Sequence, residues 1–165
     1  MRRATRKRIE KLANKLERKP RIAIFILPGQ PPGSYFAEHD RRIIKALEVW
    51  QECLKLPCEV KILSNSGTAD CNGLTVAEYM NRQLVYYAKE LKLGDVEPYI
   101  LIGEQKSGST AGQIIHSLED LISQGWDLII LVSNWWHLLV AGFYFKHLAG
   151  LPFVKEWSSP ASGCL

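Results

Sequence analysis

The stretch RIAIFILPG, residues 21–29, decides the fold of this chain. Residues 22–27 form a continuous apolar run, mostly β-branched or aromatic, which predicts a strand buried on both faces. The proline and glycine that follow end the strand and predict a stiff loop over residues 28–35. A strand buried on both faces requires helices on both sides of its sheet, so the rest of the chain should supply them.

The same succession of strand, loop and helix repeats along the 165 residues. The sequence predicts further strands at residues 59–64, 97–103, 127–133 and within 151–157, and helices at residues 36–54, 75–91, 110–124 and 135–149. Thr75 and Glu78 have the spacing of a capping box, and Gly125 and Gly150 stand where helices commonly end. The pattern predicts an α/β fold, with a mostly parallel sheet of about five strands and helices on both faces, in a single domain over residues 21–165.

The net charge of +4 conceals an asymmetry. Residues 1–21 have ten basic and two acidic side chains, hence +8, whereas the other 144 residues have 11 basic and 15 acidic ones, hence −4. Residues 1–20 are therefore predicted to form a basic helix or arm, and residues 2–21 could contact an anionic membrane or another polyanion. The alternative is a solvated leading helix that packs on the domain through Ile9 and Leu12. No specific nucleic-acid recognition is expected, because the body is acidic.

The apolar stretch of residues 126–145 has nearly the length of a membrane-spanning helix. Asp127, Asn134 and His137 interrupt it, and its first half is β-branched, so a buried strand, a polar turn and a buried helix fit better. The four cysteines have neither a CxxC pair nor a metal spacing, and free thiols are expected. We expect a cytoplasmic protein, with peripheral contact at the inner membrane as the alternative that the basic segment allows.

Loops that follow parallel strands meet at the carboxyl edge of the sheet, where ligands of open α/β sheets bind. In the loop before the helix at residues 110–124, Glu104, Ser107, Ser109 and Thr110 bring a carboxylate and three hydroxyl groups together. A helix N-terminus offers free N–H groups, so this loop could hold an anion or a ribose phosphate. The alternative is that Ser109 or Thr110 simply caps the helix.

The polar turn SNWWH, residues 133–137, ends the fourth strand at the same edge. His137 there could act as an acid, a base or a metal ligand, or it could be a hydrogen-bonded core residue. The other histidines, at positions 39, 116 and 147, are expected on helix surfaces. Neither a P-loop nor a nucleophile-elbow motif occurs in the chain. A serine hydrolase would need a catalytic triad, and the only plausible one combines Ser107 or Ser133 with His137 and Glu104.

Several short motifs follow one another in an order that resembles the YdcF-like family, a group of unknown function that includes the bacterial envelope proteins SanA and ElyC. The matching residues are Gly29 and Gln30 in the first loop, Arg42 and Ala46 in the next helix, residues 64–67 after the second strand, Glu104, Ser107 and Thr110 after the third, and Ser133, His137 and Ala141 after the fourth. The chain departs from the family pattern at Val76, Ser109, Gly112, Gln113 and Val140, where the family has Glu, Asn, Glu, Asn and Arg.

The resemblance implies a Rossmann-like three-layer sandwich with a ligand pocket at the strand ends. Glu104 and His137 are then the candidate catalytic residues. The candidate ligand-binding residues are Gly29, Gln30, Arg42, Ser66, Gly67, Ser107, Ser109, Thr110, Ser133 and Asn134. Family members are associated with envelope processes and with S-adenosylmethionine, which becomes a candidate cofactor.

Two functions follow as hypotheses. In the first, the chain binds a small nucleotide-like or sugar-phosphate ligand at the carboxyl edge of its sheet, in connection with bacterial envelope processes. In the second, it is a degenerate, non-catalytic interaction module that is recruited through its basic N-terminal segment. The residues alone leave open whether the chain is an enzyme.

Overall fold

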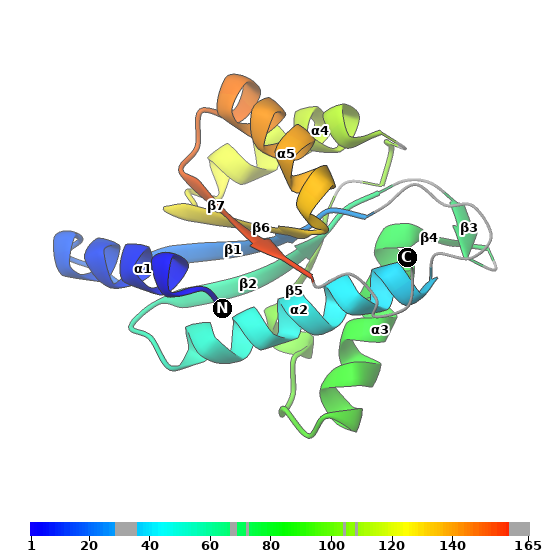
Figure 1. The fold of residues 1–165 in the computed structure, drawn as a ribbon, viewed down its shortest axis with the longest axis horizontal. Coiled ribbons are helices and arrows are strands. Elements are labelled where there is room, and N and C mark those ends of the chain that lie inside the picture. The colour runs from blue at the N-terminus through cyan, green and yellow to red at the C-terminus, as the bar shows by residue number, and fades with distance from the viewer. Residues whose placement is uncertain (29–35, 67–68, 72, 104, 108, 159–165) are drawn as a thin grey trace.

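A computed structural model describes residues 1–28, 36–66, 69–71, 73–103, 105–107 and 109–158 of the chain. Figure 1 shows a central sheet with helices α4 and α5 above it and helices α2 and α3 below it. The helices are α1 (Arg3–Lys15), α2 (Phe36–Leu54), α3 (Val76–Glu90), α4 (Thr110–Ser123) and α5 (Trp135–Tyr144), and the sheet strands are β1 (Arg21–Ile26), β2 (Glu59–Ser64), β5 (Ile100–Ile102), β6 (Leu128–Ser133) and β7 (Phe153–Trp157). The predicted α/β class is confirmed.

The five sheet strands are all parallel, in the order β5-β2-β1-β6-β7. The chain builds outward from β1 to β2 and β5, and then returns to the other side of β1 to build β6 and β7. The strand order therefore reverses between β1 and β6. This arrangement is a Rossmann-like three-layer sandwich, as predicted.

The two faces of the sheet carry two separate apolar cores. The lower core lies between the sheet and helices α1, α2 and α3, and Ile22, Ile24 and Ile26 of β1 belong to it. The upper core lies between the sheet and helices α4 and α5, and Ala23 and Phe25 of β1 belong to it. The strand β6 alternates in the same way, with Leu128, Ile130 and Val132 in the lower core and Ile129 and Leu131 in the upper one. Successive side chains of a strand point to opposite faces, so a strand between two helical layers has to be apolar throughout.

Local deviations from the predicted elements have identifiable causes. The third sheet strand is shorter than predicted, because Pro98 initiates a 3-10 turn at Glu97–Tyr99 ahead of β5. A small antiparallel hairpin, β3 (Ala69–Cys71) with β4 (Leu74–Thr75), lies in the predicted loop after β2. The last helix ends in a π-helical turn, Phe145–Ala149, before Gly150 at φ 62°. His39 was predicted on a surface but is buried, because α2 turns it toward Tyr79 on α3.

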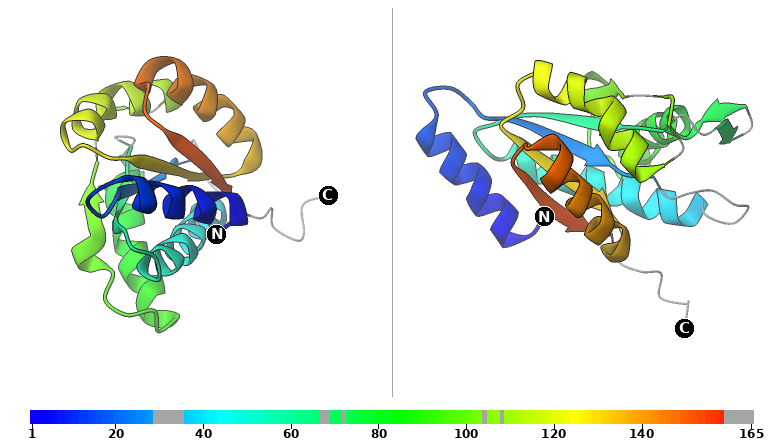
Figure 2. Two further views of the ribbon diagram at one scale, coloured as in Figure 1. Left: turned by 90° about the vertical axis from the view of Figure 1, so that its left-hand side faces the viewer. Right: turned by 90° about the horizontal axis from the view of Figure 1, so that it is seen from above.

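Helix α1 is docked on the sandwich. Its Ile9 is completely buried in the lower core. A buried carboxylate of β7, Glu156, accepts hydrogen bonds from the backbone N–H of Arg2 and the hydroxyl of Thr5. The guanidinium of Arg2 lies 4.6 Å from the ring centre of Trp157. These contacts fix the N-terminal end of α1 against the edge strand, and Figure 2 shows this end of the helix beside β7.

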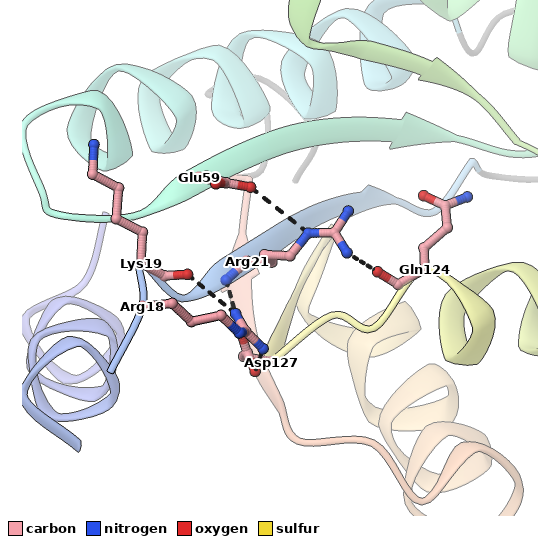
Figure 3. A network of polar contacts seen from close by, with 6 residues as sticks. All are labelled: Arg18, Lys19, Arg21, Glu59, Gln124 and Asp127. Carbon is pink, nitrogen blue, oxygen red and sulfur yellow. Dashed lines mark hydrogen bonds and ion pairs between the residues drawn. The ribbon is translucent and has the colours of Figure 1, made fainter. Parts of the chain in front are cut away.

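The connection between α1 and β1 is fixed at the opposite, amino edge of the sheet (Figure 3). The guanidinium of Arg18 donates two hydrogen bonds to Asp127, at 2.7 and 2.9 Å, and the backbone N–H of Arg21 donates a third to the same carboxylate, at 2.7 Å. Arg21 also donates to the backbone carbonyl of Gln124 and lies 3.7 Å from a carboxylate oxygen of Glu59. Burial acts to raise the pKa of Asp127, but these bonds outweigh it and hold the pKa below its usual value.

Within the described ranges, no helix is long and apolar enough to cross a membrane. The apolar stretch of residues 126–145 divides into β6 and α5, as predicted. Cys53 and Cys58 are free thiols.

Candidate functional site

In a sheet of this topology, ligands are expected outside the carboxyl ends of the strands where the strand order reverses, and this position is called the crevice below. It lies between the carboxyl ends of β1 and β6. Leu27 and Pro28 leave β1 at this point, and Ser133 and Asn134 lead from β6 into α5. Polar side chains reach the crevice from the lower layer, on α2, and from the upper layer, on α5.

From below, α2 supplies a completely buried guanidinium, that of Arg42. Its Nη1 donates a hydrogen bond of 2.6 Å to the carbonyl of Leu27, and its Nη2 pairs with the carboxylate of Glu38 one helical turn earlier. Its Nε is buried and has no hydrogen-bond partner among the described residues. Burial lowers the pKa of Arg42 and the carboxylate of Glu38 opposes that shift, so the charge depends on this partner.

Glu38 joins the lower layer to the turn after β6. Its carboxylate accepts from Arg42 and from the side-chain amide of Asn134. Burial acts to raise the pKa of Glu38, but the charge and hydrogen bond of Arg42 and the amide of Asn134 outweigh it and leave the pKa below its usual value. Glu38 is thus an ionised member of the site that the motifs did not indicate. Its spacing of four residues before Arg42 was the available signal.

From above, the turn after β6 supplies a buried serine and a buried histidine. The hydroxyl of Ser133 lies 3.0 Å from Nδ1 of His137 and 3.3 Å from the carbonyl of Leu27, which also accepts from Arg42. If the hydroxyl donates to Leu27, it accepts from Nδ1–H of the imidazole, which leaves Nε2 as the basic nitrogen. Asn134 caps α5 by accepting the backbone N–H of His137 at 3.0 Å.

His137 is held in its neutral form. Burial, with the positive charge of Arg42, lowers the pKa of His137 to about 4, and Glu38 acts in the opposite direction. The indole of Trp136 stacks on its outer side, with ring centres 5.4 Å apart. A neutral imidazole can accept a proton or donate one hydrogen bond, but it does not contribute a positive charge at neutral pH.

The low pKa of His137 makes the stability of the fold sensitive to acid. Between pH 6.5 and about 4 the unfolded chain binds a proton that the folded chain excludes, so the free energy of unfolding falls as the pH falls through this window. We expect a loss of about 3 kcal/mol from this group. We expect urea denaturation at pH 7, 5.5 and 4.5 to show that the free energy of unfolding falls less with pH in His137→Gln than in wild type. In His116→Gln, which alters an exposed histidine on α4, it should fall as much as in wild type. Equal falls in wild type and His137→Gln would contradict the assignment.

A second polar cluster lies at the carboxyl ends of β2 and β5, below the start of α4. The amide of Asn65 donates 2.5 Å to the hydroxyl of Ser117, which donates 2.6 Å to the carbonyl of Gln113. The hydroxyl of Ser66 donates 3.4 Å to the carbonyl of Ser107. All of these side chains are buried, and Oδ1 of Asn65 lies against the α-carbon of Gly103. The cluster is closely packed and fixes the base of the loop before α4.

Ser109 is the N-cap of α4. Its Oγ accepts the backbone N–H of Gly112 at 3.1 Å, and its carbonyl accepts that of Gln113 at 2.8 Å. Ser107 supports the cap, because its Oγ accepts the N–H of Ser109 at 3.2 Å. Of the two capping alternatives, Ser109 therefore makes the cap, and Thr110 is the first residue of the helix.

The structure divides the predicted site residues into two groups. Arg42, Ser133, Asn134 and His137 meet at the strand-order reversal, whereas Ser66, Ser107 and Ser109 belong to the second cluster. The predicted residues Gly29, Gln30, Gly67 and Glu104 lie outside the described residues. Their roles stay predictions.

Ser133 lacks the exposure that a catalytic nucleophile requires. It is completely buried, and its hydroxyl is shared between His137 and the backbone of β1. A nucleophile must reach the substrate, so this serine orients the imidazole instead. Within the described residues, no group of three or more His, Cys, Asp or Glu side chains could hold a metal ion.

Comparison with known proteins leaves the family open. No family model matches the chain, and no curated protein matches it. The resemblance to the YdcF-like family therefore stays a prediction.

Proposed function

We propose that the chain binds a small anionic molecule, nucleotide-like or a sugar phosphate, in the crevice between β1 and β6. One observation carries the proposal: the completely buried Arg42 is linked through the part-buried Glu38 to Asn134, and these groups meet the neutral His137 where the strand order reverses. A buried guanidinium is costly to place, so the position of Arg42 at the expected ligand crevice favours function over stability alone.

Each residue of the crevice has a role in this proposal. Arg42 and Glu38 hold the carbonyl of Leu27 and the amide of Asn134, and so they fix the two strand ends that form the walls. Helix α5 begins at the crevice, and the partial positive charge of its N-terminus attracts an anion. His137, held neutral, is the candidate proton acceptor if the bound molecule reacts, with Glu104 as the second candidate. A link to bacterial envelope processes follows only from the family resemblance.

Ligand-induced thermal stabilisation tests the proposal. The panel contains AMP, glucose 1-phosphate, inorganic phosphate and S-adenosylmethionine. A ligand present at a hundred times its dissociation constant stabilises the fold by about 2.7 kcal/mol, which raises the melting temperature by roughly 5–10 °C. We expect His137→Ala to lose this shift and His116→Ala, on the exposed face of α4, to retain it. Equal shifts in wild type and His137→Ala would place the ligand elsewhere.

A second candidate function is that of a non-catalytic module recruited to anionic surfaces by α1. The exposed face of this helix carries the basic residues Arg3, Lys7, Arg8, Lys11 and Lys15, none of which forms an ion pair with a described residue. The basic residues Arg2, Arg6, Arg18 and Arg21, in contrast, are paired with carboxylates. Five unpaired cations along one helix face favour contact with anionic lipid.

Cosedimentation with vesicles that contain phosphatidylserine tests this second candidate. Changing Lys7, Lys11 and Lys15 to glutamine should weaken binding roughly 100-fold at low salt, at about 1 kcal/mol for each lysine. The matched control changes Lys55, Lys89 and Lys92 to glutamine, which removes the same charge from other exposed positions. Equal losses in both triple variants would show that net charge, and not the α1 surface, governs binding.

A further inference from the structure

The outward face of α5 is apolar along its whole length. Its exposed side chains are Trp135, Trp136, Leu139, Val140 and Phe143, with exposed fractions of 46–61%. The inward face is mostly apolar as well, since Leu138 and Ala141 belong to the upper core, with His137 as a buried polar residue near its start. A helix in the outer layer of a sandwich normally turns polar residues to water, and a helix that is apolar all round is normally buried. No described part of the chain covers this side of α5.

We propose that a second copy of this chain covers the outward face of α5, so that the protein forms a two-fold symmetric dimer through this helix. The face has the form that such packing needs. Trp135, Leu139 and Phe143 are spaced four residues apart and form one ridge, and Trp136 and Val140 form a second ridge beside it. Ridges of this spacing fit into the grooves of an identical helix that crosses at about −50°.

The area of the face agrees with a dimer interface. A large apolar side chain offers roughly 150–250 Å² when it is fully exposed. At the observed exposed fractions, the five side chains present about 500 Å² in each copy, so a pair would bury about 1,000 Å² from these residues alone. This sum reaches the size at which specific interfaces begin.

The charges around the face favour a protein partner over a lipid surface. Residues 135–144 contain no lysine or arginine, whereas helices that bind anionic lipid have cations beside their apolar residues. The basic face of α1 does not supply them, because α1 and α5 lie on either side of β7 in Figure 2. Two cations adjoin the helix: Lys146, about 10 Å along the axis from Leu139, and Lys155 of β7, whose side chain lies against Gly142 beside the buried side of the helix.

The dimer interface would begin directly beside the crevice. Trp136 belongs to the outward face of α5, and its indole stacks on the ring of His137. A second copy that covers Trp136 also excludes water from the outer side of this histidine. The interface and the crevice therefore share one turn of chain, although the dimer does not depend on what the crevice binds.

The oligomeric state of purified full-length chain tests the proposal. Sedimentation velocity should show a dimer of about twice 18.7 kDa. Leu139→Glu and Phe143→Glu, which place a charge in the interface, should each weaken dimerisation by at least about 100-fold. Tyr86→Glu is the matched control, because Tyr86 is equally exposed on α3, below the sheet, and this variant should stay dimeric. Circular dichroism and melting curves confirm that each variant is folded.

A second measurement does not depend on the charged variants. Val140→Cys, near the two-fold axis, should form an intermolecular disulfide with oxidised glutathione as the oxidant, and Tyr86→Cys should not. A wild-type chain that stays monomeric up to about 100 µM would overturn the proposal. Dimers that persist in both charged variants would also overturn it. The proposal would also be overturned if the wild-type chain bound neutral phosphatidylcholine vesicles and Leu139→Glu did not, because lipid would then cover the outward face of α5.

Discussion

Replacing Arg42 by alanine is expected to lower the free energy of unfolding by about 3–5 kcal/mol. The guanidinium is completely buried, and its removal leaves the carbonyl of Leu27 and the carboxylate of Glu38 without their partner. Breaking a buried pair from one side costs more than the pair contributes, because a charge is left uncompensated. Urea denaturation at pH 7 measures the loss directly.

Three variants isolate the role of Arg42. Arg41→Ala, at the neighbouring and partly exposed position of α2, should change the stability by less than about 0.5 kcal/mol. The double variant Arg42→Met with Glu38→Gln removes both charges, and it should be more stable than Arg42→Ala. A single variant Arg42→Ala as stable as wild type would contradict the buried pair.

Replacing Gly103 by alanine is expected to cost about 3 kcal/mol or more, through overpacking. A Cβ atom there would lie 1.5 Å from Oδ1 and 2.7 Å from Cγ of Asn65, and 2.8 Å from the carbonyl oxygen of Ser64. The carbonyl belongs to the backbone of β2, and the Asn65 side chain is held by Ser117, so neither can move freely. The loop that leaves β5 would have to shift away from the second polar cluster.

The role of Asn65 in limiting the space at Gly103 can be tested in the same experiment. Ile102→Ala, at the preceding and exposed position of β5, should be close to neutral. Combining Gly103→Ala with Asn65→Ala removes two of the three close contacts, so the double variant should be more stable than the sum of the single changes. Additive losses would show that Asn65 does not limit the space at Gly103.

The large elements of the fold could be predicted because their signals are periodic. Residues 22–27 and 128–132 are apolar at every position, as strands between two helical layers must be, and the structure places them side by side in β1 and β6. The capping box of Thr75 and Glu78 marks the start of α3 where it was expected. The short hairpin of β3 and β4 was missed, because a few residues carry no periodicity that separates a strand from a loop.

The position of the candidate site in the fold could be predicted, but the full set of residues that form it could not. The rule that loops converge at the carboxyl edge led to Ser133, Asn134 and His137, and the motif series led to Arg42. Neither the rule nor the motif series revealed Glu38, since a carboxylate one turn before an arginine is also the pattern of an ordinary exposed ion pair on a helix. Sequence spacing also could not show that Ser66 and Ser107 belong to a separate cluster, because that depends on which strands are neighbours.

The contact between Thr5 and Glu156 determines when the fold can be completed during synthesis. The two residues are 151 positions apart, and β7, which carries the carboxylate, is the last strand of the sheet. As the chain leaves the ribosome from its N-terminus, α1 emerges early and has to wait until β7 has been made. The docking of α1 is then one of the last steps of folding, and it occurs together with closure of the sheet edge.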